Sequence, residues 1–315
     1  MRKNKLIASV ALALGFCAAL PAANAADKPL KSVGITVGSL GNPYFVTISR
    51  GAEAKAKQIN PDVKVTAVSS DYDMNKQFTQ IDNFISAHVD MILLNAVDPK
   101  AIEPAVKKAQ KAGIVVVAVD VAAAGADATV QTNNVQAGEL ACDFLAKKLN
   151  GKGNVVIENG PQVSAVIDRV KGCKSVMAKN PGIKVLSDDQ DAKGSREGGM
   201  NAMQGYLTRF PTLNGVFAIN DPQAIGSDLA AKQLHRKDIV ITSVDGAPDI
   251  ESALKTDTMV QASASQDPWM MAQTAVSVGY DLMNGKKPSS TVILMPSTLV
   301  TRENVGSYKG WSSPR

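Results

Sequence analysis

Aromatic residues are scarce in this chain, and histidine and cysteine are scarcer still. Phe, Trp and Tyr make up 4% of the 315 residues, and there are two His and three Cys. Two histidines give little support to a metal site or to a histidine general base. No Gly-x-Ser-x-Gly elbow, Walker loop or post-strand Gly-x-Gly-x-x-Gly occurs either. We therefore expect a protein that is not an enzyme and that uses no cofactor and no bound metal.

Long apolar runs and clustered charges are also absent beyond the N-terminus. The net charge is +5, and no Lys/Arg cluster resembles a nucleic-acid footprint. The apolar run at residues 6–20 follows three basic residues and precedes small residues ending at Ala25. It is shorter than the roughly 20 residues that a membrane span needs, and it has the parts of a secretory signal peptide. We expect residues 1–25 to be cleaved after Ala25, leaving a soluble periplasmic chain with no nucleic-acid partner.

Two cysteines remain beyond this leader. Cys142 and Cys173 each lie on a segment whose sequence pattern predicts a helix. In an oxidising compartment a disulfide is one interpretation, and two buried free thiols are the other. The sequence does not show whether the two sulfur atoms meet.

Strand-like and helix-like segments alternate along the whole mature chain. The apolar run at 32–38 precedes a helix start at Asn42, and the run at 91–94 is buried on both faces by its composition. Near-continuous apolar strands between amphipathic helices are typical of parallel sheets covered on both faces.

The two halves of the chain repeat each other. "LNAVDPKAI" is echoed by "FAINDPQAI", and "NPDVKV" by "NPGIKV", each at a spacing of about 120 residues. Aspartates that close β-branched runs, Asp120 and Asp245, match at nearly the same spacing. The repeat predicts an α/β protein built of two similar, doubly wound parallel-sheet lobes that face each other.

Polar residues follow several of the predicted strands. In such sheets ligands bind beyond the carboxyl ends of the strands, which makes Asn42, Asp120, Asn220 and Asp245 candidate ligand contacts. Asp120 and Asp245 lead into loops and not into helices. Buried acids without a partner are costly, so ligand hydroxyl groups would be suitable partners for them.

Other acidic residues have simpler interpretations. Asp98 and Asp221 directly precede helices, and we expect both to cap them. The segment 71–82 resembles an EF-hand loop in its acidic positions, but Lys76 stands where that loop needs glycine. Helix capping explains these acids better than calcium does.

A few aromatic and basic side chains complete the candidate set. Tyr44 and Phe45 sit beside the first strand–helix turn, where their rings could stack on a sugar. Arg169 could bind the same ligand, or it could form a surface salt bridge. Trp269 is either a cleft residue or an exposed anchor for a partner.

Several motifs together resemble a known family. "GSLGNPYFVTISRGAEAKA", "VVVAVD", "VFAIND", "VDGAPD" and "ASASQDP", after a signal peptide, are similar to the ribose-type periplasmic sugar-binding proteins of ABC importers. The resemblance covers essentially the whole mature chain. It implies two α/β lobes joined by a three-segment hinge, with an N-terminal lobe of residues 28–132 plus 266–293. The C-terminal lobe would be residues 133–265 plus 294–315.

The resemblance also implies a ligand site. Carried over position by position, it comprises Asn42, Tyr44, Phe45, Asp120, Arg169, Asn220, Asp245 and Gln266. It further implies a disulfide between Cys142 and Cys173 within one lobe, away from the sugar. Four positions depart from the family pattern, namely Gly38 for a serine, Val121 for an arginine, Gly194 for an aromatic and Val244 for an aromatic. A polyol, a furanose or a bulkier sugar derivative is therefore an alternative to ribose.

The implied function is delivery of a monosaccharide or related polyhydroxylated ligand to an inner-membrane ABC permease by a monomeric protein. A chemoreceptor is a possible second partner. The alternatives are the same fold with a non-sugar ligand, such as a nucleoside or a signalling molecule, and a cytoplasmic regulator. The signal peptide argues against the regulator, because it stands where a repressor would carry its DNA-binding helices.

Overall fold

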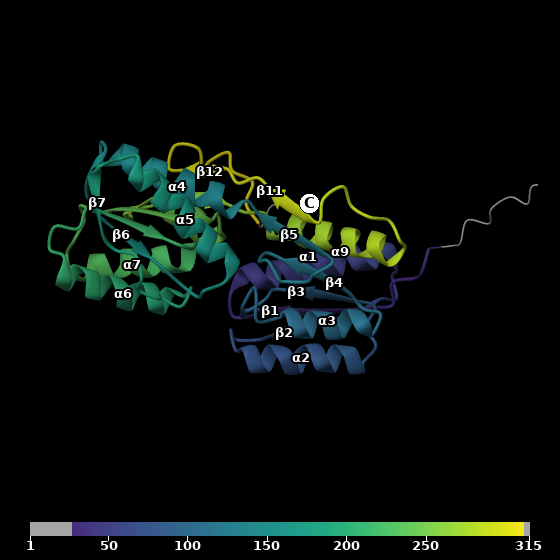
Figure 1. Ribbon diagram of the computed structural model, residues 1–315. Coiled ribbons are helices and arrows are strands. Elements are labelled where there is room, and N and C mark those ends of the chain that lie inside the picture. Colours follow the sequence, from purple (N-terminus) through teal and green to yellow (C-terminus); the bar gives the residue numbers. More distant parts are fainter. Residues whose placement is uncertain (1–26, 312–315) are drawn as a thin grey trace, which may run out of the picture.

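The computed structural model describes residues 27–311, so the predicted signal peptide and its cleavage after Ala25 lie outside the described residues. Two lobes lie side by side, and the chain passes between them more than once (Figure 1). Within the described range, no helix combines the length and the apolar character that crossing a membrane requires.

The first lobe contains an all-parallel sheet in the spatial order β11-β5-β4-β3-β1-β2. Its strands are β1 (Ser32–Val37), β2 (Lys64–Ser69), β3 (Met91–Leu94), β4 (Val115–Val119), β5 (Ala128–Thr132) and β11 (Val292–Met295). Its helices are α1 (Pro43–Ile59), α2 (Met74–Ser86), α3 (Glu103–Lys111) and α9 (Pro268–Met283). Helices α1 and α9 cover one face of the sheet, and α2 and α3 cover the other (Figure 1).

The second lobe repeats this plan in the order β12-β10-β9-β8-β6-β7. Its strands are β6 (Lys152–Glu158), β7 (Gly182–Ser187), β8 (Gly215–Ala218), β9 (Val240–Asp245), β10 (Val260–Ser265) and β12 (Leu299–Thr301). Its helices are α4 (Asn134–Lys148), α5 (Ser164–Ala178), α6 (Arg196–Arg209), α7 (Asp221–Gln233) and α8 (Pro248–Lys255). Only β12 runs antiparallel among these paired strands. The predicted pair of doubly wound α/β lobes is confirmed, with this one antiparallel edge strand added.

One apolar cluster is shared by both lobes. It includes Ile92 and Val106 of the first lobe together with Leu145 and Phe217 of the second, all fully buried. Separate clusters fill the remaining face of each sheet. The apolar core is therefore continuous across the boundary between the lobes.

The chain passes from one sheet to the other in three short segments. These follow β5 at residue 133, β10 at 266–267 and β11 at 296–298. Strand β11 pairs with β5 as far as Met295, so the first sheet extends two residues past the expected boundary at 293. Hinge motion about these three segments stays a prediction.

The capping residues predicted from the sequence agree with the structure only in part. Asn42 caps α1 and Asp73 caps α2 through their side chains. Asp98 accepts hydrogen bonds from the amides of Lys100 and Ala101, so it caps the turn before α3 and not the helix itself. The expectation for Asp221 is wrong, because Asn220 caps α7 and Asp221 is buried inside its first turn.

Candidate functional site

The candidate residues surround one cavity between the lobes. The empty space between them is about 480 Å³, which includes open solvent at the mouth of the cavity. The eight residues selected from the sequence all line it: Asn42, Tyr44, Phe45, Asp120, Arg169, Asn220, Asp245 and Gln266. A larger opening of about 1410 Å³ adjoins it and shares Asn42, Tyr72, Gly194 and Asp245 with its wall. The structure therefore brings the predicted residues together, and their role in binding stays a proposal.

The first turn of α1 supplies one wall. Asn42 accepts a hydrogen bond from the amide of Tyr44 at 3.0 Å, and Pro43 fixes the helix start. This start directs the buried rings of Tyr44 and Phe45 into the cavity, where they meet edge to face at 5.4 Å.

Two further aromatic residues extend this wall, and the sequence interpretation missed both. Tyr72 lies 6.5 Å from Phe45 and lines the cavity, and Trp311 lies 5.3 Å from Tyr44. A side chain at Gly38 would come within 2.7 Å of the Tyr72 ring, so the glycine leaves room for that ring. The scarcity of aromatic residues was the one signal that could have found them, because in such a chain each aromatic side chain is a candidate for the binding site.

Asp120 directly follows β4 and is buried. It accepts hydrogen bonds from the Tyr44 hydroxyl at 2.7 Å and from Nδ2 of Asn95 at 2.8 Å. Its backbone φ is 71°, a conformation that L-residues rarely adopt and that is often found at functional sites. Burial raises the pKa of Asp120, while the Tyr44 hydroxyl and the charge of Arg169 lower it. Asn95 was not predicted, because its link to Asp120 crosses from β3 to β4.

Asp245 is the counterpart of Asp120 in the second lobe. It ends β9 with a φ of 140°, and its Oδ1 accepts from Nε2 of Gln266 at 2.7 Å. Burial raises the pKa of Asp245 to about 6, and the nearby guanidinium of Arg169 opposes that rise. Both aspartates thus end matching strands in uncommon backbone conformations and face one cavity.

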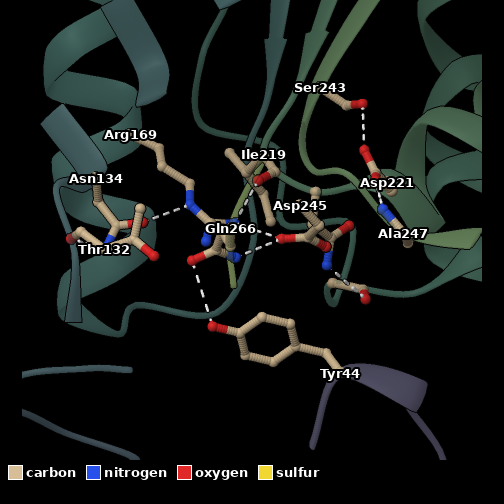
Figure 2. A network of polar contacts seen from close by, with 12 residues as sticks. Tyr44, Thr132, Asn134, Arg169, Ile219, Asp221, Ser243, Asp245, Ala247 and Gln266 are labelled. Atoms are coloured by element: carbon tan, nitrogen blue, oxygen red, sulfur yellow. Dashed lines mark hydrogen bonds and ion pairs between the residues drawn. The ribbon is translucent and has the colours of Figure 1, made fainter. Parts of the chain in front are cut away.

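Arg169 lies inside the site and does not form a surface salt bridge. Its side chain is 6% exposed, and its Nη1 lies 3.4 Å from Oδ1 of Asp245. Nε donates to Asn134 at 2.9 Å and Nη1 to the carbonyl of Ile219 at 2.8 Å. These bonds hold the guanidinium plane in a fixed orientation beside the cavity (Figure 2).

Gln266 connects the lobes. Its Oε1 lies 3.3 Å from the Tyr44 hydroxyl, and its Nε2 donates to Asp245. The single proton of Tyr44 serves one acceptor at a time, either Gln266 or Asp120. The carbonyl of Gln266 also accepts from the indole of Trp311 at 3.1 Å. Figure 2 shows Tyr44 reaching from the first lobe toward this group.

The side chain of Asn220 makes more hydrogen bonds within the protein than the sequence indicates. Its Oδ1 caps α7 by accepting from the amide of Gln223, and its Nδ2 donates to the carbonyl of Gly194 at 3.0 Å. One N–H remains for a ligand.

Two earlier candidates have structural roles. Trp269 is half-buried on α9 next to Gly51 of α1 and is not part of the cavity wall. Among residues 27–311, no group of three or more His, Cys, Asp or Glu could hold a metal ion. Asp71 pairs with Lys76, and Asp82 with Lys108.

The predicted disulfide is confirmed. Cys142 and Cys173 are bonded, with their Cα atoms 5.1 Å apart. The bond links α4 to α5, two helices that approach so closely that a side chain at Gly138 would meet the Arg169 carbonyl. Because α5 also carries Arg169, the bond lies one helical turn from a cavity residue, which is nearer to the candidate site than expected.

Comparisons with known proteins agree with this geometry. A family profile described as "Periplasmic binding protein domain" matches residues 33–287. This chain belongs to that family. Its membership also supports the expectation that the chain is not an enzyme.

Individual relatives cover most of the chain. The ribose import binding protein of Bacillus subtilis (strain 168) is 33% identical over 273 residues, 85% of this chain and 87% of that protein. The xylitol-binding protein of Mycolicibacterium smegmatis is 32% identical over 306 residues, 95% and 85% respectively. A solved solute-binding protein of Bacillus halodurans with bound myo-inositol superposes with a TM-score of 0.81 at 27% identity, covering 90% of this chain and 99% of that one. The resemblance to ribose-type binding proteins is confirmed.

The departures from the ribose-type pattern differ in their consequences. Val121 and Gly194 line the cavity. Val121 gives it an apolar surface, and Gly194 leaves space where the family has a side chain. Val244 is fully buried in the apolar cluster shared by the lobes. The cavity of this family member therefore has a distinct wall beside Asp120 and beside Asn220.

Proposed function

We propose that this chain is the periplasmic solute-binding protein of an ABC importer and binds an uncharged monosaccharide or polyol between its lobes. The observation that carries the proposal is the pair of buried aspartates, Asp120 and Asp245. They come from different lobes and line one cavity. A ligand that bonds both would hold the lobes together.

The free hydrogen-bonding capacity of the cavity suits a ligand rich in hydroxyl groups. A carboxylate offers about four acceptor positions. Asp120 uses two of them, for Tyr44 and Asn95, and both neighbours are neutral. Hydroxyl groups of a ligand could fill the rest, and the aromatic wall of Tyr44, Phe45 and Tyr72 could contact its C–H groups.

The charges at the cavity favour an uncharged ligand over an acidic one. Arg169 is the one cation among the described residues that line it, against Asp120 and Asp245. Arg169 is already shared with Asn134 and the Ile219 carbonyl. A sugar acid or sugar phosphate would bring a further negative charge into a site where charges are weakly screened.

The remaining parts of the proposal follow from the family and the leader. The named relatives include import binding proteins, which supports an inner-membrane permease as the partner. The N-terminal signal peptide supports cleavage after Ala25 and a periplasmic location. We propose a monomer that closes about its three crossing segments, and a chemoreceptor as a possible second partner.

A thermal-shift screen of the refolded mature protein tests the ligand class. Refolding removes any ligand retained during purification. The panel contains pentoses, hexoses, polyols, matched sugar acids and nucleosides. A ligand at 100 times its dissociation constant adds roughly 2.7 kcal/mol of stability, which moves the melting temperature measurably.

We expect a shift with one or a few uncharged sugars or polyols and none with the matched acids. A shift with nucleosides alone would favour the non-sugar alternative. A shift with the acids, or turnover of a sugar, would contradict the proposal.

A further inference from the structure

A further buried acid lies beside the candidate site. Asp221 is 1% exposed and lies in the first turn of α7. Its Oδ1 accepts from the hydroxyl groups of Ser243 at 2.5 Å and Ser263 at 2.7 Å, and its Oδ2 accepts from the amide of Ala247 at 2.7 Å. One carboxyl group therefore ties together α7, β9, β10 and the turn after β9 (Figure 2).

These partners enclose the residue that matters for binding. Asp245 stands between Ser243 and Ala247 in the sequence, and the turn continues through Gly246 at a φ of 71°. The Gly246 amide donates to the Ser263 hydroxyl at 3.1 Å, and its carbonyl accepts from the Tyr308 hydroxyl at 3.0 Å. The uncommon backbone of Asp245 is thus held from both sides by one buried network.

An ordinary capping role does not explain these contacts. Asn220 already caps α7, so Asp221 is not needed there. Its counterpart in the repeat, Asp98, is exposed and accepts hydrogen bonds from two amides of its own turn, those of Lys100 and Ala101. Buried acids are costly unless they are fully hydrogen-bonded, and Asp221 directs its three bonds at the segment around Asp245.

We propose that Asp221 is a positioning residue that holds the Asp245 turn in the conformation that presents the Asp245 carboxylate to the ligand. This inference rests on the proposed function of Asp245 as a ligand contact. Burial and the nearby charge of Asp245 raise the pKa of Asp221 to about 8, so the neutral acid prevails at neutral pH. A neutral Asp221 keeps the same three contacts with one of them reversed: a protonated Oδ1 donates to one serine oxygen and accepts from the other, while Oδ2 still accepts from the Ala247 amide.

The test compares three variants of the mature protein: Asp221→Ala, Asp221→Asn and the matched control Asp98→Ala. The asparagine can accept from the Ala247 amide and donate to the serine oxygens, so it mimics the neutral acid. Calorimetric titration with D-ribose and xylitol measures affinity. Hydrogen–deuterium exchange of residues 244–248 measures the turn without any ligand.

We expect Asp221→Ala to weaken binding of whichever probe binds the wild type by about 100-fold, and to speed exchange in residues 244–248 at least about tenfold. Asp221→Asn and Asp98→Ala should stay within about fivefold of wild type in both measurements. Wild-type affinity and exchange in Asp221→Ala would overturn the proposal. So would a loss in both Asp221 variants with faster exchange across the whole second lobe, because that marks a purely structural role.

The exchange measurement separates this inference from the proposed function. If the wild type binds neither probe, the ligand class is in error, and exchange alone decides the role of Asp221. Faster exchange confined to residues 244–248 in Asp221→Ala, and its absence in Asp221→Asn, would still support the positioning role. Unchanged exchange in Asp221→Ala would overturn it.

Discussion

The two lobes share one plan, but they support their cavity aspartates differently. In the first lobe, Asn95 follows β3 and bonds Asp120 directly through its side chain. In the second lobe, Asp221 follows β8 and holds the backbone around Asp245 instead. The two supports come from different places in the repeat, because Asp221 is equivalent to Asp98 and Asn95 is equivalent to Ala218. A duplicated fold can thus keep equivalent cavity aspartates while residues at different positions support them.

The lobes also differ in how much buried acid they contain. Among the described residues, Asp120 is the one buried carboxyl group of the first lobe, whereas the second lobe buries four, namely Glu158, Asp221, Asp228 and Asp245. The second lobe should therefore respond more strongly to pH. The disulfide between α4 and α5 lies in this lobe as well.

The largest expected effect comes from removing the cavity aspartates one at a time. Asp120→Ala and Asp245→Ala should each weaken ligand binding by at least about 100-fold, because several charge-assisted hydrogen bonds are lost together. Calorimetric titration with the compound found in the thermal-shift screen measures this, with Asp98→Ala as the control. Near-wild-type affinity in either aspartate variant would show that the lobe carrying that aspartate does not hold the ligand as proposed.

Loss of the disulfide should affect stability more than binding. Closing the 31-residue separation between Cys142 and Cys173 is worth about 3.7 kcal/mol of unfolding free energy. The double variant Cys142→Ser and Cys173→Ser should lose stability of that order in urea unfolding. Its ligand affinity should fall by less than about tenfold, since Asn134 and the Ile219 carbonyl still orient Arg169. An unchanged unfolding midpoint would show that the bond does not stabilise the second lobe.

Stability should fall as pH rises, chiefly through the second lobe. Glu158 is buried with hydrogen bonds to Ser227 and Gln223, and burial raises its pKa to about 8. The folded protein then holds the Glu158 proton more tightly than the unfolded chain does. This contribution is complete below the unfolded pKa of about 4.3 and is lost as pH rises toward 8, by up to about 1.4 kcal/mol per pH unit.

The Glu158→Gln variant checks that contribution. Urea unfolding at pH 5 and pH 8 should show a smaller loss of stability in this variant than in wild type. The unligated protein is the right sample, because a bound ligand would add its own pH dependence through Asp245. An equal loss in both proteins would mean that Glu158 does not bind its proton more tightly in the folded state.

The smallest expected effect is the removal of one hydroxyl group from the link between the lobes. Tyr44→Phe keeps the aromatic wall and deletes the donor to Asp120 and Gln266. A single hydrogen bond of this kind corresponds to about a tenfold loss of affinity. Phe45→Leu offers the converse control, because it removes a ring and no polar group. A greater loss of ligand affinity in Tyr44→Phe than in Asp120→Ala would contradict the expected order of these effects.

The sequence predicted what depends on local pattern and on the repeat. Alternating apolar strands and amphipathic helices predicted the two sheets, and residues at strand ends, such as Asp120 and Asp245, were located because parallel strands end at one edge. Contacts between distant segments were missed. Tyr72 and Trp311 join the aromatic wall from a loop and from near the C-terminus, and no local pattern marks either one.

Asp221 shows that a local pattern can also predict the wrong role for a residue. Its place before Pro222 is typical of a helix cap, and the local pattern of Asp98 is nearly identical. The difference arises from Ser243 and Ser263, which surround Asp221 only in the folded second lobe. A repeat identifies equivalent positions, whereas tertiary packing decides what each of them does.

The central claim is that one uncharged, hydroxyl-rich ligand is held by aspartates of both lobes. The most direct measurement is mass spectrometry of the small molecule released on denaturing protein purified from the periplasm without refolding. The account predicts a neutral sugar or polyol at close to one molecule per chain, and none from the variant carrying both Asp120→Ala and Asp245→Ala. An acidic or phosphorylated compound, or equal recovery from that double variant, would contradict it.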